Sequence, residues 1–158
     1  MTKVKTRIEL AGALLAVAAL ALPGAVHAQS APQPPLPTVS LTAGGMHVIR
    51  AEVARTPAER ATGMMMRTEM PSNAGMLFVF DVEGAQCFWM KNTLLPLSIA
   101  FIADDGTIVG LADMQPRDLD NHCSPKPVRY ALEMNQGWFA KRGIKPGAKL
   151  QGGPFGAK

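Results

Sequence analysis

The sequence has few of the side chains that enzymes most often use for catalysis. It contains three histidines and two cysteines, and His27 lies in a segment that we expect to be removed. It has no Gly-x-Ser-x-Gly elbow, no His-Glu-x-x-His motif and no glycine-rich loop suited to a phosphate. These absences exclude the hydrolases, zinc peptidases and nucleotide-binding enzymes that depend on such motifs.

Charge is also scarce and nearly balanced. Only 18% of the residues are charged, and 13 basic against 11 acidic side chains lie beyond position 28. This balance argues against a nucleic-acid partner, which a protein usually attracts with a marked excess of positive charge. Hydrophobic residues make up 47% of the chain, which is enough to build a core and excludes general disorder.

The first 28 residues are typical of a secretory signal peptide. Lys3, Lys5 and Arg7 precede an apolar run from Leu10 to Leu22. The small residues that a signal peptidase recognises follow and end with Ala28, after which we expect cleavage. The run is shorter than the ~20 residues of a spanning helix. We therefore expect a periplasmic or secreted protein that meets the membrane only through this segment, with an uncleaved anchor as the alternative.

The two cysteines, Cys87 and Cys123, lie 36 positions apart. An even count in an exported protein indicates a disulfide. A loop of this size would stabilise the fold by roughly 3–4 kcal/mol if the stabilisation is purely entropic. Two buried thiols or a soft-metal site are the alternatives.

Beyond the signal, the sequence predicts a proline-rich linker over 29–38, one domain over 39–151 and a flexible tail over 152–158. One short helix begins at Thr56, with Pro57 and Glu59 placed to complete a capping box, and extends to about Met65. A second helical turn is expected over 137–142. The segment 46–53 alternates between polar and apolar residues and the segment 76–80 is an apolar run, and both patterns are typical of strands. The predicted strands cover 39–41, 46–53, 76–80, 87–90, 97–103, 108–112, 130–134 and 148–150. The pattern is typical of a mostly β fold, a small antiparallel barrel or sandwich with one or two short helices.

Several linked motifs resemble one family, the bacterial and archaeal domain of unknown function 192, also called uncharacterised protein family 0127. The resemblance spans about residues 40–150 and implies a compact, mostly β domain, often behind a signal peptide, with no established activity. The motifs that carry it are Gly63–Arg67, Gly75–Phe80, Phe88–Thr93 with Pro96-Leu97, Asp105-Gly106, Leu132-Glu133, and Gly143-Ile144 with Gly147.

The segment from Trp89 to Thr93 offers a candidate ligand site. If it is a strand, then Trp89, Lys91 and Thr93 share one side, while Asn92 lies on the other. An aromatic ring beside a cation and a hydroxyl suits a polar ligand. The alternative is that Trp89 packs in the core and that Asn92 and Thr93 secure a turn.

A carboxylate within the apolar strand around Glu133 needs either a wet face or a buried partner. Arg67 and Lys91 are the candidate partners, in a pair that is either structural or the floor of a binding site. The candidate ligand-binding residues are Arg67, Trp89, Lys91, Asn92, Thr93 and Glu133.

Two other functions remain open. A hydrolase acting on envelope material could use Glu133 or Asp113 as its carboxylate. A copper-handling protein could gather thioethers from Met64, Met66 and Met70, with His47 or His122 nearby. Methionine, however, commonly fills gaps in cores.

The interpretation that we favour is a non-catalytic periplasmic binding module for a small polar ligand, an envelope polymer or a protein partner. It requires no cofactor and no metal, and it assigns no catalytic residue.

Overall fold

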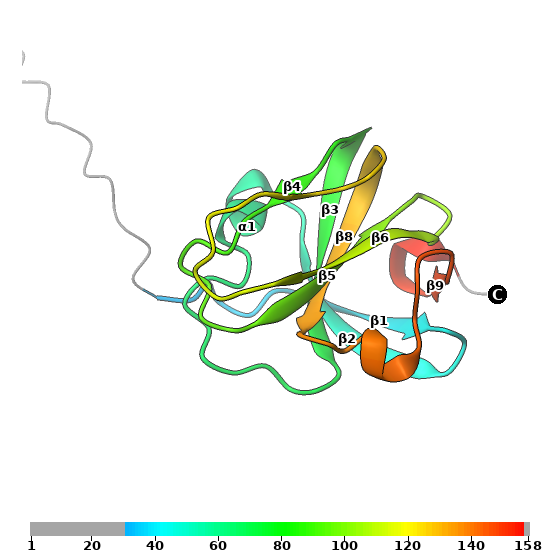
Figure 1. Ribbon diagram of the computed structural model, residues 1–158, viewed down its shortest axis with the longest axis horizontal. Coiled ribbons are helices and arrows are strands. Elements are labelled where there is room, and N and C mark those ends of the chain that lie inside the picture. The colour runs from blue at the N-terminus through cyan, green and yellow to red at the C-terminus, as the bar shows by residue number, and fades with distance from the viewer. Residues whose placement is uncertain (1–30, 157–158) are drawn as a thin grey trace, which may run out of the picture.

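The computed structural model describes residues 31–156, so the predicted signal peptide lies outside the described residues. A seven-stranded sheet curls into a half-barrel, and helix α1 and a two-stranded ribbon lie beside it (Figure 1). The elements are β1 (Thr38–Ala43), β2 (His47–Ala54), α1 (Pro57–Thr62), β3 (Ala74–Gly84), β4 (Cys87–Phe88), β5 (Leu97–Ile102), β6 (Ile108–Met114), β7 (His122–Cys123), β8 (Val128–Asn135), η1 (Ala140–Arg142), β9 (Leu150–Gln151) and η2 (Gly153–Phe155).

The strands of the large sheet follow the order β6-β5-β8-β3-β2-β1-β9, and β4 pairs with β7. The predicted mostly β fold is confirmed. All neighbouring strands are antiparallel except β2 and β3, which run parallel. The parallel pair departs from the expected antiparallel sheet because α1 and the loop after it connect β2 to β3 as a crossover. The curled sheet brings its edges together at one end, where Thr107 forms a β-bridge with Lys149.

Both faces of the sheet are covered, which gives the molecule two hydrophobic clusters. Alternate residues of β8 show the division, since Leu132 and Met134 belong to one cluster and Ala131 to the other. The first cluster packs against Trp138 and Phe139. The second lies on the side of α1 and β4, and its members include Met64, Met76, Phe78, Met90 and Phe101.

Helix α1 begins where the sequence predicts. Thr56 accepts the N–H of Glu59, and the carboxylate of Glu59 accepts the N–H of Thr56, so the capping box is complete. The helix ends at Thr62 rather than near Met65. Gly63 has φ +49°, which turns the chain back, and a Cβ there would lie 3.3 Å from the ring of Phe78.

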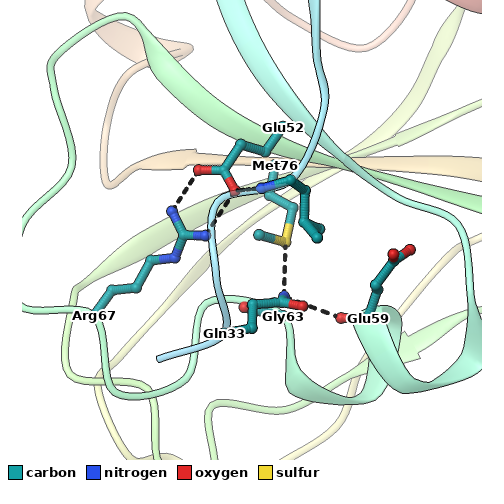
Figure 2. A network of polar contacts seen from close by, with 7 residues as sticks. Gln33, Glu52, Glu59, Gly63, Arg67 and Met76 are labelled. Carbon is teal, nitrogen blue, oxygen red and sulfur yellow. Dashed lines mark hydrogen bonds and ion pairs between the residues drawn. The ribbon is translucent and has the colours of Figure 1, made fainter. Parts of the chain in front are cut away.

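Segments at both ends of the domain make contacts that the sequence does not predict. The amide of Gln33, in the expected linker, donates to the carbonyl oxygens of Gly63 at 2.8 Å and Glu59 at 3.2 Å (Figure 2). At the other end, where a flexible tail is predicted, the ring of Phe155 packs 4.9 Å from that of Tyr130. Residues on both sides of 39–151 therefore contact the domain.

Candidate functional site

A cavity of about 250 Å³ lies beside the end of α1. Its walls are mostly apolar, and a few polar groups face it. The apolar part consists of Ala61, Gly63, Met64, Met65, Phe78, Phe80, Phe88 and Trp89, and the remaining lining residues are Arg60, Thr62, Cys87, Thr93 and Glu133. Such a mixture of apolar walls and a few polar groups is typical of small-molecule sites.

Glu133 lies at the centre of the sheet. It sits on β8, directly opposite Met76 of β3 and Ile99 of β5. Because β8 has a neighbouring strand on each side, Glu133 is only 4% exposed. Among residues 31–156 its carboxyl has no hydrogen-bond or ion-pair partner. Burial therefore raises the pKa of Glu133 to about 8. Near neutral pH the carboxyl is mostly protonated, with one O–H donor and one acceptor directed at whatever enters the cavity.

Phe88 forms the wall on the side of the short ribbon. Its ring lies 5.0 Å from that of Phe78, 6.2 Å from Phe80 and 6.0 Å from Phe101, measured between centroids. The preceding residue is bonded to Cys123, so the predicted disulfide is confirmed. The strands β4 and β7 are joined by two residue pairs. Because so short a ribbon has few hydrogen bonds of its own, the disulfide holds Phe88 in place.

Arg60 closes another side from α1. Its guanidinium donates to the carbonyl oxygens of Val79, at 2.9 Å, and of Arg55. It also lies 5.0 Å from the centroid of Phe80, which is a cation–π contact. These contacts fix the last turn of the helix against β3.

The segment from Trp89 to Thr93 is a turn, not the strand that the alternation predicts. Trp89 and Thr93 line the cavity with Glu133, whereas Lys91 and Asn92 line a different concavity. The positive φ of Asn92, +57°, breaks the alternation. Lys91 still contacts the ring of Trp89, with Nζ 5.1 Å from its centroid. Thr93 is buried, and its N–H bonds to the carbonyl of Met90.

Arg67 is not the partner of Glu133, and that part of the prediction is wrong. Its guanidinium binds both carboxylate oxygens of Glu52, a pair that Figure 2 shows beside the N-terminal segment. Glu52 lies on β2. Lys91, the other candidate, forms no ion pair within residues 31–156.

The residues of the hydrolase alternative do not come together. Asp113 pairs with Ser98 across β5 and β6, and Ser98 is opposite Met134. Glu133 is the neighbour of Met134 and points to the other face of the sheet. The carboxyl groups of Asp113 and Glu133 therefore cannot flank one bond of a substrate.

The methionines of the copper alternative are divided. Met64 is buried in the second hydrophobic cluster, and Met70 packs against that cluster, whereas Met66 lines the concavity that holds Lys91. His47 packs on Trp138, and His122 lies 3.8 Å from Asp118. Within the described part of the chain, no three His, Cys, Asp or Glu side chains are grouped to hold a metal ion.

The cavity residues that the sequence did not single out include Arg60, Phe78, Phe80 and Phe88. The capped helix start and the alternation of Phe78 and Phe80 were the available signals. The sequence does not show that the connection between β2 and β3 brings α1 close to β4.

The protein is thus a mostly β domain. Its large sheet carries the buried carboxyl of Glu133, which lines the cavity beside α1. The chain belongs to the family of domain of unknown function 192 (DUF192), described as an uncharacterized ACR, whose model matches residues 39–152.

Two solved structures are similar over most of their length. One is a Sinorhizobium meliloti protein called a "putative transcription regulator", 35% identical, with a TM-score of 0.74, covering 77% of this chain and 98% of that one. The other is a Novosphingobium aromaticivorans protein of unknown function, 39% identical, with a TM-score of 0.71, covering 82% and 93%. None of the curated proteins matches the chain. No helix among residues 31–156 is long and apolar enough to span a membrane.

Proposed function

We propose that the protein is an exported, non-catalytic binding domain for a small organic amine. The observation that carries this proposal is the carboxyl of Glu133, which is buried at an aromatic-lined cavity and lacks a partner among the described residues. A buried polar group without a partner costs free energy, and a ligand that supplies the partner recovers it. The Cys87–Cys123 disulfide and the expected signal peptide support export to an oxidising compartment.

An amine fits this environment better than a neutral polar group. An ammonium beside the carboxyl favours its ionised form and offsets the burial that raises the pKa. The rings of Phe78, Phe88 and Trp89 line the cavity, and the face of an aromatic ring attracts a cation. The guanidinium of Arg60 is already engaged by two carbonyl oxygens and the ring of Phe80, so it remains at the side of the cavity.

The size of the cavity limits the ligand. About 250 Å³ is below the roughly 300–1,000 Å³ of sites for drug-sized molecules. A single ring or a short alkyl chain with one amino group fills such a space. The ligand is therefore much smaller than an envelope polymer.

The test compares two probes that differ in the head group alone, benzylamine and benzyl alcohol. Binding is followed by the fluorescence of Trp89, and a Trp89→Phe variant identifies that signal against buried Trp138. Benzylamine is expected to bind at least tenfold more tightly than the alcohol, and Glu133→Gln is expected to remove the difference. Glu69→Gln, at an exposed carboxylate, serves as the matched control. Equal binding of benzylamine to the wild type and to folded Glu133→Gln contradicts the proposal.

A further inference from the structure

A second concavity lies on the other side of the Trp89–Thr93 turn. Its volume is about 320 Å³, and it is lined by Met66, Lys91, Asn92, Leu94, Arg117 and Leu119. It shares no lining residue with the cavity above Glu133. The same turn therefore separates the aromatic cavity that contains the carboxyl of Glu133 from a concavity that contains two cations.

Three backbone positions in this concavity are unusual. Met66, Asn92 and Arg117 have φ of +61°, +57° and +63°, and they are the non-glycine residues with positive φ in the part of the chain that the structure describes. Asparagine tolerates this conformation, but methionine and arginine adopt it at a cost that glycine would avoid. All three line the same concavity.

Backbone hydrogen bonds hold these turns together. The N–H of Met66 donates to the carbonyl of Asn92 at 2.9 Å, and the N–H of Arg117 donates to the carbonyl of Thr93 at 3.1 Å. The N–H of Met90 donates to the backbone carbonyl of Asp118 at 2.9 Å. Three segments that are distant in the sequence are thereby fixed around one opening, so the arrangement does not depend on a bound molecule.

The cations of this concavity are unpaired. Lys91 and Arg117 form no ion pair with any acidic side chain in residues 31–156. The nearest acid in sequence, Asp118, is engaged elsewhere, because its carboxylate accepts the N–H of Asp120 at 3.0 Å and lies 3.8 Å from His122. Lys91 contacts the ring of Trp89, and its ammonium forms no ion pair with a carboxylate of the described residues.

We infer that this concavity binds an oxyanion, a phosphate or carboxylate group attached to a small apolar body. The guanidinium of Arg117 offers a planar fork of N–H donors for two oxygens, and Lys91 adds a second positive charge. The side chains of Met66, Leu94 and Leu119 provide an apolar rim for the rest of the ligand. This site is separate from the amine site and goes beyond the proposed function.

The backbone strain supplies a sharp test. Arg117→Gly removes the cation and relieves the positive φ, so the variant is expected to fold at least as stably as the wild type while losing the anion. Lys91→Gln removes the second charge. Arg117→Lys keeps a charge without the fork, and Arg50→Gln, at an exposed cation on β2, is the matched control.

The probe is phenyl phosphate, followed by the amide NMR signals of Lys91, Asn92 and Arg117. Saturable binding is expected, weakened at least tenfold by Arg117→Gly and by Lys91→Gln, less by Arg117→Lys, and not at all by Arg50→Gln.

A parallel arm uses vesicles of phosphatidylglycerol and of phosphatidylcholine. Binding to the anionic vesicles alone, lost in Arg117→Gly and without binding of phenyl phosphate, assigns the oxyanion to a lipid headgroup and supports the site. No binding of either probe, or binding that Arg117→Gly and Lys91→Gln leave unchanged, overturns the inference.

Discussion

The guanidinium of Arg67 binds both carboxylate oxygens of Glu52, at 2.6 and 2.8 Å. The same carboxylate accepts the N–H of Leu36 at 2.8 Å. One ion pair therefore joins the turn after α1, the strand β2 and the N-terminal segment. Both side chains are 17% exposed, so solvent screens the pair only in part.

Glu52→Gln and Arg67→Met are each expected to lower the free energy of unfolding by roughly 1–3 kcal/mol, because each leaves a half-buried partner unpaired. The double variant is expected to be more stable than the sum of the two losses predicts, with a coupling energy of about 1 kcal/mol. Urea denaturation measures all three. Arg50→Gln, an exposed neighbour on β2, controls for loss of charge alone, and additive losses would show that the pair contributes nothing.

The same pair has a pH signature. Hydrogen bonding by Arg67 holds the pKa of Glu52 below its ordinary value, against the opposing effect of burial. Its contribution is thus fully present above the ordinary pKa of a glutamate and is lost as the pH falls through the lower folded value. The stability difference between the wild type and Glu52→Gln is expected to shrink on acidification below about pH 4. A difference that is constant down to pH 2.5 would rule this out.

Helix α1 positions Arg60 at the cavity and is only two turns long, so its cap matters. Thr56→Ala removes the side-chain acceptor for the N–H of Glu59 and is expected to cost about 1 kcal/mol. Thr56→Ser keeps the acceptor and is expected to restore most of that loss. Thermal denaturation followed by circular dichroism checks both variants, and equal melting of Thr56→Ala and Thr56→Ser would contradict a role for the cap.

The local features of the fold were predictable because they depend on neighbours in the chain. The capping box at Thr56, the hairpin between β1 and β2 and the Asp105-Gly106 turn each follow from a few adjacent residues. The parallel pairing of β2 with β3 was not predictable, because it depends on how the crossover packs. The docking of Gln33 was missed since proline-rich composition indicates an extended chain but not what that chain contacts.

The candidate site was likewise predictable only in part. Glu133 stands out in sequence as a carboxylate within an apolar strand, and the structure places it beside Trp89 and Thr93. Arg67, Lys91 and Asn92 lie elsewhere. Strand alternation places Lys91 on the side of Trp89 and Thr93, and this is wrong because the left-handed residue Asn92 turns the chain there. Such positions are hard to predict when the residue is not glycine.

The disulfide is expected to stabilise the domain and its cavity together. The double variant Cys87→Ser/Cys123→Ser loses a cross-link between positions 36 apart, at an expected cost of about 2–4 kcal/mol. Because the ribbon of β4 and β7 has two residue pairs, the ring of Phe88 is expected to become mobile before the large sheet unfolds. Hydrogen exchange at Phe88 and His122, compared with β8, measures this order. Equal protection of both regions would contradict it.

At Gly75, β3 lies close against the backbone of β8. A Cβ at this position would lie 2.5 Å from the carbonyl oxygen of Glu133 and 2.4 Å from the sulfur of Met134. Gly75→Ala is therefore expected to push the two strands apart and to cost about 3 kcal/mol. Gly84→Ala, in the same strand, is the matched control, because its nearest neighbour is a flexible glutamine side chain at 3.6 Å. Denaturation of both variants in urea gives the comparison, and similar losses would show that the contact is easily relaxed.

Glu133 makes the stability of the unliganded protein depend on pH in the opposite sense to Glu52. Burial raises its pKa from 4.5 to about 8, so the folded state holds a proton that the unfolded chain releases at lower pH. The stability that this proton confers is fully present below about pH 4.5 and is lost as the pH rises through 8. The expected slope between these values is about 1 kcal/mol of unfolding free energy for each pH unit. Glu133→Gln keeps the shape and cannot ionise, so its stability is expected to change little over the same range. Subtracting the two profiles cancels the contributions of groups that both proteins share, and a difference that stays constant from pH 5 to pH 8 would show that Glu133 is ionised in the folded protein.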